Sequence, residues 1–280
     1  MENNKKRRGM KEIRAYAKQR PKVFTVYVIL RLLVVAVLVR SAMLKEYESM
    51  FVCLLVLVLF MLPSFLERKL KIELPDTLEI IILVFIFAAE ILGELECYFI
   101  QYPNWDTMLH TTSGFLCAAI GFSLVNLLNK DNRISLSLSP LYMAIAAFCF
   151  SMTIGVLWEF FEWGVDSLMA KDMQKDTIVQ AIHSVTLHPE GRNIPVHVKD
   201  IADVILVHSD GSQTPLGVGG YLDIGLIDTM SDLLVNFIGA VVFSVIGFFY
   251  VKSQGKGKLA SQFIPQLMDK QQEPEKQEEL

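Results

Sequence analysis

Residues 141–166 read LYMAIAAFCFSMTIGVLWEFFEWGVD, a run of apolar side chains that ends among three carboxylates. The part from Leu141 to Glu162 is long enough to cross a bilayer, because a spanning helix needs roughly 20 predominantly apolar residues. A charged side chain at membrane depth is costly unless it is paired or hydrated, and it marks a candidate functional site. The stretch therefore predicts a membrane span with functional carboxylates at its end.

The rest of the chain repeats this pattern. Hydrophobic residues make up 52% of the 280 positions and are gathered into long blocks separated by short charged segments. We therefore predict an all-α integral membrane helical bundle with about six transmembrane helices. The predicted spans are Phe24–Leu44, Met50–Leu66, Thr77–Tyr98, Thr107–Leu128, Leu141–Glu162 and Ser231–Val251. The second is the weakest candidate because it is short and contains Pro63.

Charges in the short connections predict the orientation. Residues 1–22 are rich in Lys and Arg, and so are the connections after the second and fourth spans and the segment after the last span. Such segments stay on the cytoplasmic side, where they meet anionic lipid. We expect residues 1–22 to be a basic cytoplasmic terminus and residues 253–280, rich in Gln, Glu and Lys, to be a disordered cytoplasmic tail. The bilayer is the predicted partner, and no nucleic-acid partner is expected.

The first five predicted spans lie in residues 23–169, and the sixth lies in residues 231–252. Residues 170–230 connect the fifth span to the sixth. Their pattern changes to short alternating runs: TIVQAIHSVTL, IPVHVKDI and ADVILVHSDGSQTPLGV predict strands, with SDGS as a hairpin turn. We expect a small β-rich extracytoplasmic insertion, a cap of two or three strands resting on the membrane part. Its histidines are interpreted as surface or packing residues: His183, His188, His197 and His208.

The four cysteines all lie inside predicted spans and lack CxxC spacing. We interpret Cys53, Cys97, Cys117 and Cys149 as apolar packing residues and expect no disulfide framework.

Each of the last four predicted spans carries polar residues at helical spacing, so that each set shares one face of its helix. The sets are Glu90 and Glu94; Asp106 and His110; Glu159, Glu162 and Asp166; and Asp228, Asp232 and Asn236. The predicted orientation puts all four sets near the outer membrane boundary. They therefore predict one outward-facing carboxylate and histidine site, for which Arg40 at the outer end of the first span is a candidate compensating cation.

Alternative roles exist for some of these residues. Asp106 and Asp228 precede their predicted spans, where an aspartate caps free amide donors and suits the positive helix end. Trp105, Trp158 and Trp163 are typical of an interfacial aromatic belt. Capping does not explain Glu90, Glu94, Glu159 and Glu162, because they lie toward the negative ends of outward-running helices.

One histidine among several carboxylates predicts a set of ligands for a divalent metal: the oxygens suit Mg, Mn or Ca, and the imidazole admits Zn or Fe. The predicted metal ligands are Asp106, His110, Glu159, Glu162 and Asp232. Glu159, Glu162 and His110 are also the catalytic candidates, with Glu90, Glu94, Asp166, Asp228, Asn236 and Arg40 in supporting positions. The ExxH repeat of di-iron bundles is absent, as are GxSxG, HExxH and P-loop motifs.

Three stretches, WDTMLHTTSGF, WEFFEWGVD and DTMSDLLVNFIGA, resemble an uncharacterised family of bacterial polytopic membrane proteins with a domain of unknown function. More distantly they resemble the VanZ-like family. That resemblance implies matching roles for Asp106 and His110, for Glu159 or Glu162, and for Asp232, Asn236 and Gly239. It covers roughly Trp105 to Ala240, and the strand-rich insertion departs from the compact VanZ-like pattern. VanZ-like proteins are linked to low-level glycopeptide resistance, which implies a role in the cell envelope.

These observations favour a protein of the bacterial plasma membrane and leave three functions open. The first is an enzyme acting on an envelope lipid or lipid-linked phosphate, in which bound metal polarises the phosphoryl group. The second is a cation- or proton-coupled transporter that uses the same carboxylates and His110. The third is an envelope accessory protein in which the polar cluster only holds the helices together.

Overall fold

The computed structural model describes residues 16–130 and 138–267. Five helices in these ranges are long and apolar enough to cross a membrane, and they confirm the predicted membrane bundle: Pro21–Leu44, Tyr47–Lys69, Trp105–Asn129, Pro140–Met169 and Leu226–Lys252. The described chain divides into two compact units. Unit 1 contains residues 16–130, 138–153 and 235–267, and unit 2 contains Ile154–Leu234.

In unit 1, helices α2 (Pro21–Leu44) and α3 (Tyr47–Leu59) form a hairpin. Helix α2 contacts α5 (Asp76–Ile86), and α3 contacts the π-helix that continues α5. Helix α2 ends where Lys45 adopts a left-handed conformation with φ of 61°. The core between these helices is apolar and includes Val34, Val56 and Leu83, each fully buried. A membrane helix whose outer face meets lipid buries its inner face against neighbouring helices in this way.

The second predicted span is bent rather than straight. Helix α3 ends at Leu59, and α4 (Leu62–Leu70) begins after a short turn. Pro63 lies in the first turn of α4, where its missing N–H costs no helical hydrogen bond. The proline that weakened this prediction therefore marks a real break in the helix.

The third predicted span consists of two kinds of helix. Helix α5 passes directly into a π-helix, η1 (Phe87–Leu95), and the short α6 (Tyr98–Gln101) follows. π-Helical turns are rare and are found frequently at functional sites. Together α5 and η1 cover most of the predicted Thr77–Tyr98 block, so about six helical spans agree with the structure.

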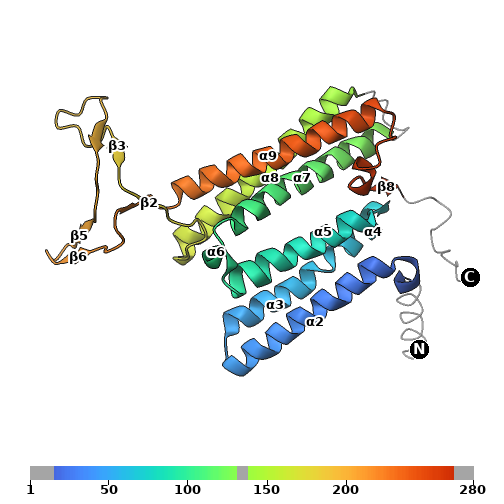
Figure 1. Cartoon of the computed structure of the whole chain (residues 1–280), viewed down its shortest axis with the longest axis horizontal. Coiled ribbons are helices and arrows are strands. Elements are labelled where there is room, and N and C mark those ends of the chain that lie inside the picture. Colours follow the sequence, from blue (N-terminus) through green and yellow to red (C-terminus); the bar gives the residue numbers. More distant parts are fainter. Residues whose placement is uncertain (1–15, 131–137, 268–280) are drawn as a thin grey trace, which may run out of the picture. The chain divides into compact units, whose positions relative to one another are not determined.

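Helices α7 (Trp105–Lys130), α8 (Pro140–Met169) and α9 (Leu226–Lys252) supply the second part of the unit 1 core (Figure 1). Two glycines allow α7 and α9 to touch. A Cβ on Gly114 would lie 2.2 Å from the carbonyl oxygen of Asn236, and one on Gly239 would lie 2.1 Å from that of Thr111. Small residues at a crossing are typical of membrane helices, which associate through close backbone packing.

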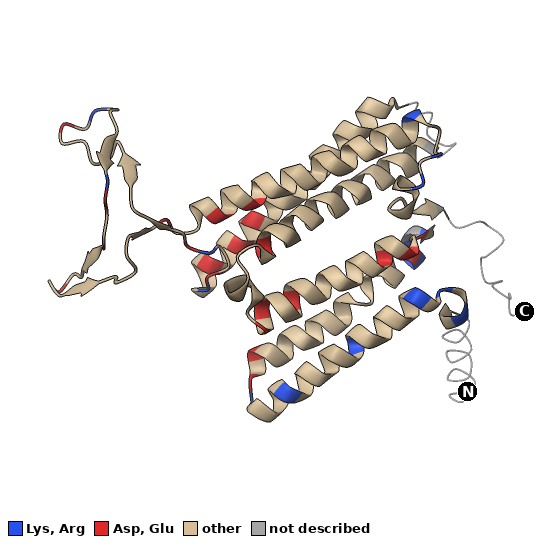
Figure 2. Ribbon diagram, in the orientation of Figure 1, with Lys and Arg blue, Asp and Glu red and all other residues tan. Residues whose placement is uncertain are grey.

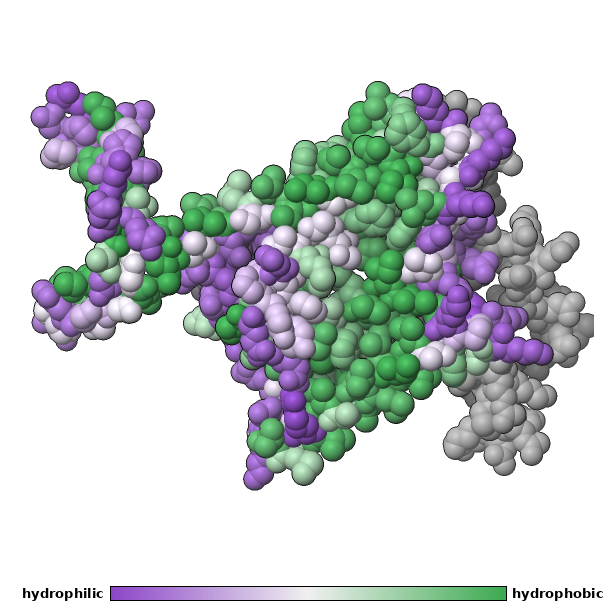
Figure 3. All heavy atoms as spheres, viewed as in Figure 1, coloured by the Kyte–Doolittle hydropathy of each residue, from purple (hydrophilic) through white to green (hydrophobic). Residues whose placement is uncertain are grey.

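The surface of unit 1 matches a bilayer. Figure 3 shows a broad hydrophobic band across the middle of its helices, with hydrophilic residues toward both helix ends. Many large apolar side chains in this band are exposed, for example Leu32, Val58 and Phe65. A soluble protein rarely exposes so large an apolar surface, so this band is the lipid-facing surface.

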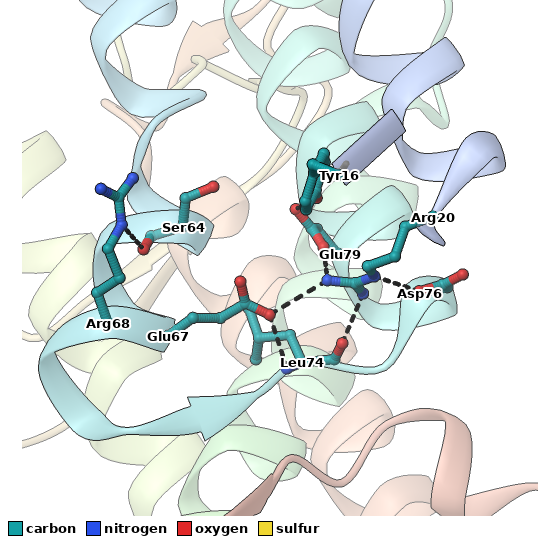
Figure 4. A network of polar contacts seen from close by, with 8 residues as sticks. All are labelled: Tyr16, Arg20, Ser64, Glu67, Arg68, Leu74, Asp76 and Glu79. Carbon is teal, nitrogen blue, oxygen red and sulfur yellow. Dashed lines mark hydrogen bonds and ion pairs between the residues drawn. The ribbon is translucent and has the colours of Figure 1, made fainter. Parts of the chain in front are cut away.

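A polar cluster at one end of unit 1 joins α2, α4 and α5 (Figure 4). The Arg20 guanidinium lies 3.2 Å from Glu67, 2.5 Å from Asp76 and 2.8 Å from Glu79. It also donates to the carbonyl of Leu74 at 2.6 Å. The Tyr16 hydroxyl donates to Glu79 at 3.0 Å. We call Arg20, Glu67, Asp76, Glu79 and Tyr16 the Arg20 cluster.

Burial and neighbouring charges both shift the pKa values of Tyr16 and Arg20 in this cluster. Burial raises the pKa of the Tyr16 hydroxyl, and the Glu79 carboxylate raises it further. Burial acts against the charge of Arg20, but the hydrogen bond to Asp76 and the charge of Glu79 hold its pKa above the ordinary value. Both residues therefore stay in their donor forms. A strand pair at the same end, β1 (Ile72–Glu73) with β8 (Gln266–Leu267), brings the segment after α9 next to α4.

Unit 2 contains the last part of α8, the insertion and the first turns of α9. The insertion holds three separate antiparallel pairs: β2 (Ile178–Val179) with β7 (Tyr221–Leu222), β3 (Ile182–Ser184) with β4 (Val196–Val198), and β5 (Ile205–Val207) with β6 (Gln213–Pro215). The predicted strands are confirmed, but the single cap of two or three strands is wrong, because the chain turns between pairs instead of adding strands to one sheet.

The predicted SDGS hairpin turn is present between β5 and β6. Gly211 has a φ of 84°, a left-handed conformation that favours glycine. The Asp210 carboxylate accepts the backbone N–H and the hydroxyl of Ser212, and these hydrogen bonds lower the pKa of Asp210.

All four cysteines are free thiols, as predicted. Cys53 is buried in the α2–α3 core and is a packing residue, whereas Cys97 and Cys149 are exposed. The packing interpretation is therefore wrong for those two residues. Residues 1–15 and 268–280, which include most of the predicted basic terminus and half of the predicted tail, lie outside the described residues.

Candidate functional site

Three carboxylates of unit 2 lie together where α8 approaches its end and α9 has just begun. Glu159 and Glu162 are three positions apart on α8, and Asp232 lies in the second turn of α9. Each offers one carboxylate oxygen, and these oxygens all lie within 4.8 Å of one another. The three residues are 4%, 8% and 4% exposed. We call Glu159, Glu162 and Asp232 the carboxylate triad.

Aromatic residues of the same helix border the triad. The Trp158 indole N–H donates to Oε1 of Glu162 at 2.8 Å, and this bond orients one of the triad carboxylates. Trp158 also packs on Phe161, with ring centroids 5.3 Å apart, while Trp163 is exposed. The tryptophans thus act both as a belt of apolar surface and, in the case of Trp158, as a hydrogen-bond donor to the site.

The Asp106–His110 pair lies in unit 1, in the first two turns of α7. Nε2 of His110 is 3.5 Å from Oδ1 of Asp106, one helical turn away. The start of α7 is held by Trp105, whose indole N–H donates to the carbonyl of Ala88 at 3.3 Å and whose ring packs on Tyr98. Asp106 is the second residue of the helix, so the predicted N-cap role is wrong, and its carboxylate faces His110.

Asp166 and Asp228 have a structural role in unit 2. Asp166 accepts the backbone N–H groups of Met173 and Gln174 at 2.6 and 2.8 Å, and Asp228 accepts that of Lys175 at 2.8 Å. Asp228 is inside α9, not at its N-cap. These aspartates secure the segment that follows α8, and they use their oxygens in doing so.

That segment also contains Asp172 and Asp176, together with Lys171 and Lys175. Burial raises the pKa of Asp176, and the nearby carboxylates of Asp172 and Asp223 raise it further. Asp223 itself accepts the N–H groups of Thr177 and Ile227. The acidic residues here mostly satisfy backbone donors of the linker.

The remaining predicted residues do not join the triad. Glu90 and Glu94 lie in the π-helix η1, outside the carboxylate triad. Arg40 pairs with Glu96 at 2.6 Å. Arg40 therefore compensates the charge of Glu96, a residue that sequence reasoning did not consider. Asn236 is buried beside Gly114 and donates to the Met152 sulfur at 3.6 Å.

The residue types of the triad suit a cation. Carboxylate oxygens are the preferred ligands of Mg²⁺, Mn²⁺ and Ca²⁺. Figure 2 shows the acidic residues of unit 2 near the end of α8 and the start of α9. Neither helix contains Lys, Arg or His except Lys252, the last residue of α9. The helices that supply the carboxylates therefore do not supply a matching charge at that depth.

The Arg20 cluster was missed by sequence reasoning, which interpreted the basic residues of the N-terminal segment and of the connection after the second span only as orientation signals. Arg20 is 47 to 59 positions away from its carboxylate partners, so no local spacing connects them. The available signal was an arginine directly before Pro21 at a helix start, together with two carboxylates in the first turn of α5.

Comparison with known proteins gives one match. A family model described as "Predicted membrane protein (DUF2238)" matches residues 26–253. No curated protein and no solved structure matches the chain. The family match covers four of the five candidate spans completely and most of the first, Pro21–Leu44, and it confirms the resemblance to membrane proteins with a domain of unknown function.

Proposed function

The chain belongs to the DUF2238 family of predicted membrane proteins, and we propose that its function depends on a divalent metal held by the carboxylate triad. The observation that carries the proposal is three buried carboxylates with oxygens within 4.8 Å of one another. We further propose that the site hydrolyses or transfers a phosphate of an envelope lipid or lipid-linked compound.

Electrostatics support a bound cation. Two ionised carboxylates less than 5 Å apart repel each other by about 3 kcal/mol or more at an effective dielectric constant near 20. Three such groups are expensive to keep ionised together in a buried position unless a cation or protons offset them. A divalent ion offsets two charges at once and uses the oxygens as ligands.

We propose from the sequence that Asp106 and His110 belong to the same site. Asp106 and His110 are one helical turn apart at the start of one predicted span. The predicted orientation puts them near the same outer boundary as the residues of the triad. An imidazole there would also extend the range of metals to Zn or Fe.

The residues then have separate tasks. Glu159, Glu162 and Asp232 hold the ion, and Trp158 fixes the orientation of Glu162. His110, held by Asp106, moves a proton to or from the reacting water or leaving group. A bound divalent ion would supply Lewis-acid polarisation of a phosphoryl oxygen. A lipid-linked substrate suits this location because exposed Phe160, Phe161 and Trp163 surround the triad on α8 with lipid-facing surface.

We also propose the bacterial plasma membrane as the location, with both termini cytoplasmic. The support is the distribution of Lys and Arg among the short connections. Reporter fusions test it: a fluorescent protein fused after residue 280 should be active, and a phosphatase inserted after Gly211 should be active outside the cell. The opposite pattern would invert the proposed orientation.

The decisive experiment is elemental analysis of detergent-purified protein combined with a turnover assay on a lipid-linked pyrophosphate. We expect about one equivalent of divalent metal in the wild type and at least tenfold loss of metal affinity in Glu159→Gln, since even partners that only orient a ligand contribute 10 to 100-fold. The matched control is Glu94→Gln, a carboxylate on η1 outside the triad. His110→Ala should reduce turnover more than metal content.

Three outcomes distinguish the candidate functions. Metal-dependent phosphate release that is lost in Glu159→Gln supports the enzyme. Cation or proton flux in proteoliposomes without product overturns the enzyme in favour of a transporter. Folded protein that holds no metal, with Glu159→Gln and Glu94→Gln indistinguishable in all assays, overturns the metal site and leaves an accessory role.

A further inference from the structure

Two histidines of the insertion face each other across one strand pair. His183 on β3 and His197 on β4 are directly opposite in the antiparallel register. Their Nδ1 atoms are 2.7 Å apart, and their ring centroids 4.6 Å apart. Both side chains are exposed. The chain thus presents two imidazole nitrogens, aimed at one point, on the surface of unit 2.

We propose that His183 and His197 form a second metal site, selective for imidazole-binding cations such as Zn²⁺, Cu²⁺ and Ni²⁺. Two metal–nitrogen bonds of about 2.0–2.1 Å at a tetrahedral angle separate the two nitrogens by roughly 3.3 Å. The rings therefore need to move apart by only about half an ångström, and exposed side chains make such adjustments freely. The metal takes the place of the proton that the two nitrogens otherwise share.

The site has open coordination positions. Residues on the same face of the pair, at alternate positions along each strand, are Ala181 and Val185 on one side and Pro195 and Lys199 on the other. None offers a carboxylate or thiolate. The protein therefore supplies two ligands, and water or an external ligand supplies the rest, as in sites that exchange metal or bind a further molecule.

The preferred metals separate this site from the carboxylate triad. Neutral imidazole favours Cu²⁺, Ni²⁺ and Zn²⁺, whereas a set of three carboxylates suits Mg²⁺, Mn²⁺ and Ca²⁺. The proposal does not rest on the function proposed above. The competing explanation is a histidine–histidine hydrogen bond that only stabilises the hairpin.

The test is Cu²⁺ titration of the full chain in detergent, followed by electron paramagnetic resonance. We expect a signal with two nitrogen ligands at one equivalent of Cu²⁺. His183→Ala and His197→Ala should each remove one nitrogen and weaken Cu²⁺ binding by about tenfold or more. The matched control is His208→Ala, another exposed histidine of the insertion, whose Nε2 contacts the Thr214 hydroxyl.

A second measurement leaves the histidines unchanged. Zn²⁺ should protect His183 and His197 from acylation by diethyl pyrocarbonate, read by mass spectrometry, and leave His188 and His208 reactive. Protection must persist in Glu159→Gln, which separates this proposal from the proposed function. Equal acylation of all four histidines with and without Zn²⁺, or unchanged Cu²⁺ affinity in folded His183→Ala, would overturn the proposal and leave only the hydrogen bond.

Discussion

Two groups of three carboxylates lie within the helices of this protein, and they are balanced in different ways. In the Arg20 cluster, Glu67, Asp76 and Glu79 surround one guanidinium within 3.2 Å or less. In the carboxylate triad, Glu159, Glu162 and Asp232 approach each other, and the helices that carry them provide no basic residue except at the far end of α9.

This difference separates a structural cluster from a candidate site. An arginine fixed by three carboxylates and a carbonyl has its donors committed, so it joins helices and leaves no room for a ligand. The triad instead brings three acceptors of two helices together, and carboxylate oxygens are the ligands that a divalent cation prefers.

The largest effect is expected from Arg20→Leu. The substitution removes the cation from Glu79, whose side chain is only 4% exposed, and leaves a buried carboxylate without compensation. Breaking a buried pair in this way costs about 3–5 kcal/mol. Thermal unfolding in detergent, followed by circular dichroism, should show a large drop in the midpoint.

The control is Arg68→Leu. Arg68 is exposed and donates to the Ser64 carbonyl of its own helix, so its loss should change stability by about 0.5 kcal/mol or less. If both variants lost the same stability, the Arg20 cluster would have no special structural role.

Metal should stabilise the protein through the triad. A ligand that binds only the folded state at 100 times its Kd adds about 2.7 kcal/mol. We expect Mn²⁺ or Mg²⁺ to raise the unfolding midpoint of the wild type and to leave that of Asp232→Asn unchanged. An equal rise in both proteins would show that the metal acts elsewhere.

A glutamate-to-glutamine substitution should have opposite effects on stability in the carboxylate triad and in the Arg20 cluster when metal is removed with a chelator. Glu159→Gln removes repulsion and should stabilise the metal-free protein by about 1–3 kcal/mol. Glu79→Gln removes a partner of Arg20 and should destabilise it by a similar amount. Unfolding midpoints of both variants against the wild type decide the matter: destabilisation by Glu159→Gln would mean that its charge is already compensated without metal.

Sequence reasoning was most successful where the bilayer or the helical repeat dictated the answer. The length of the apolar blocks predicted the spans, and the three-residue spacing of Glu159 and Glu162 predicted that they share a face. The π-helical turn at Phe87–Leu95 was not predictable, because it depends on which carbonyl each amide selects and not on composition. The Arg20 cluster and the His183–His197 pair depend on long-range packing and strand register.

The smallest effect is expected at Arg40, whose ion pair with Glu96 resembles the Arg20 contacts in distance but not in environment. The two side chains are 49% and 33% exposed, so solvent and salt screen their attraction. Exposed pairs contribute about 0–1 kcal/mol, and Arg40→Gln should therefore lower the unfolding midpoint far less than Arg20→Leu. Raising the salt concentration should erase the difference between Arg40→Gln and the wild type while leaving the Arg20→Leu defect in place. If salt erased both differences, burial would not be what distinguishes the Arg20 cluster from a surface pair.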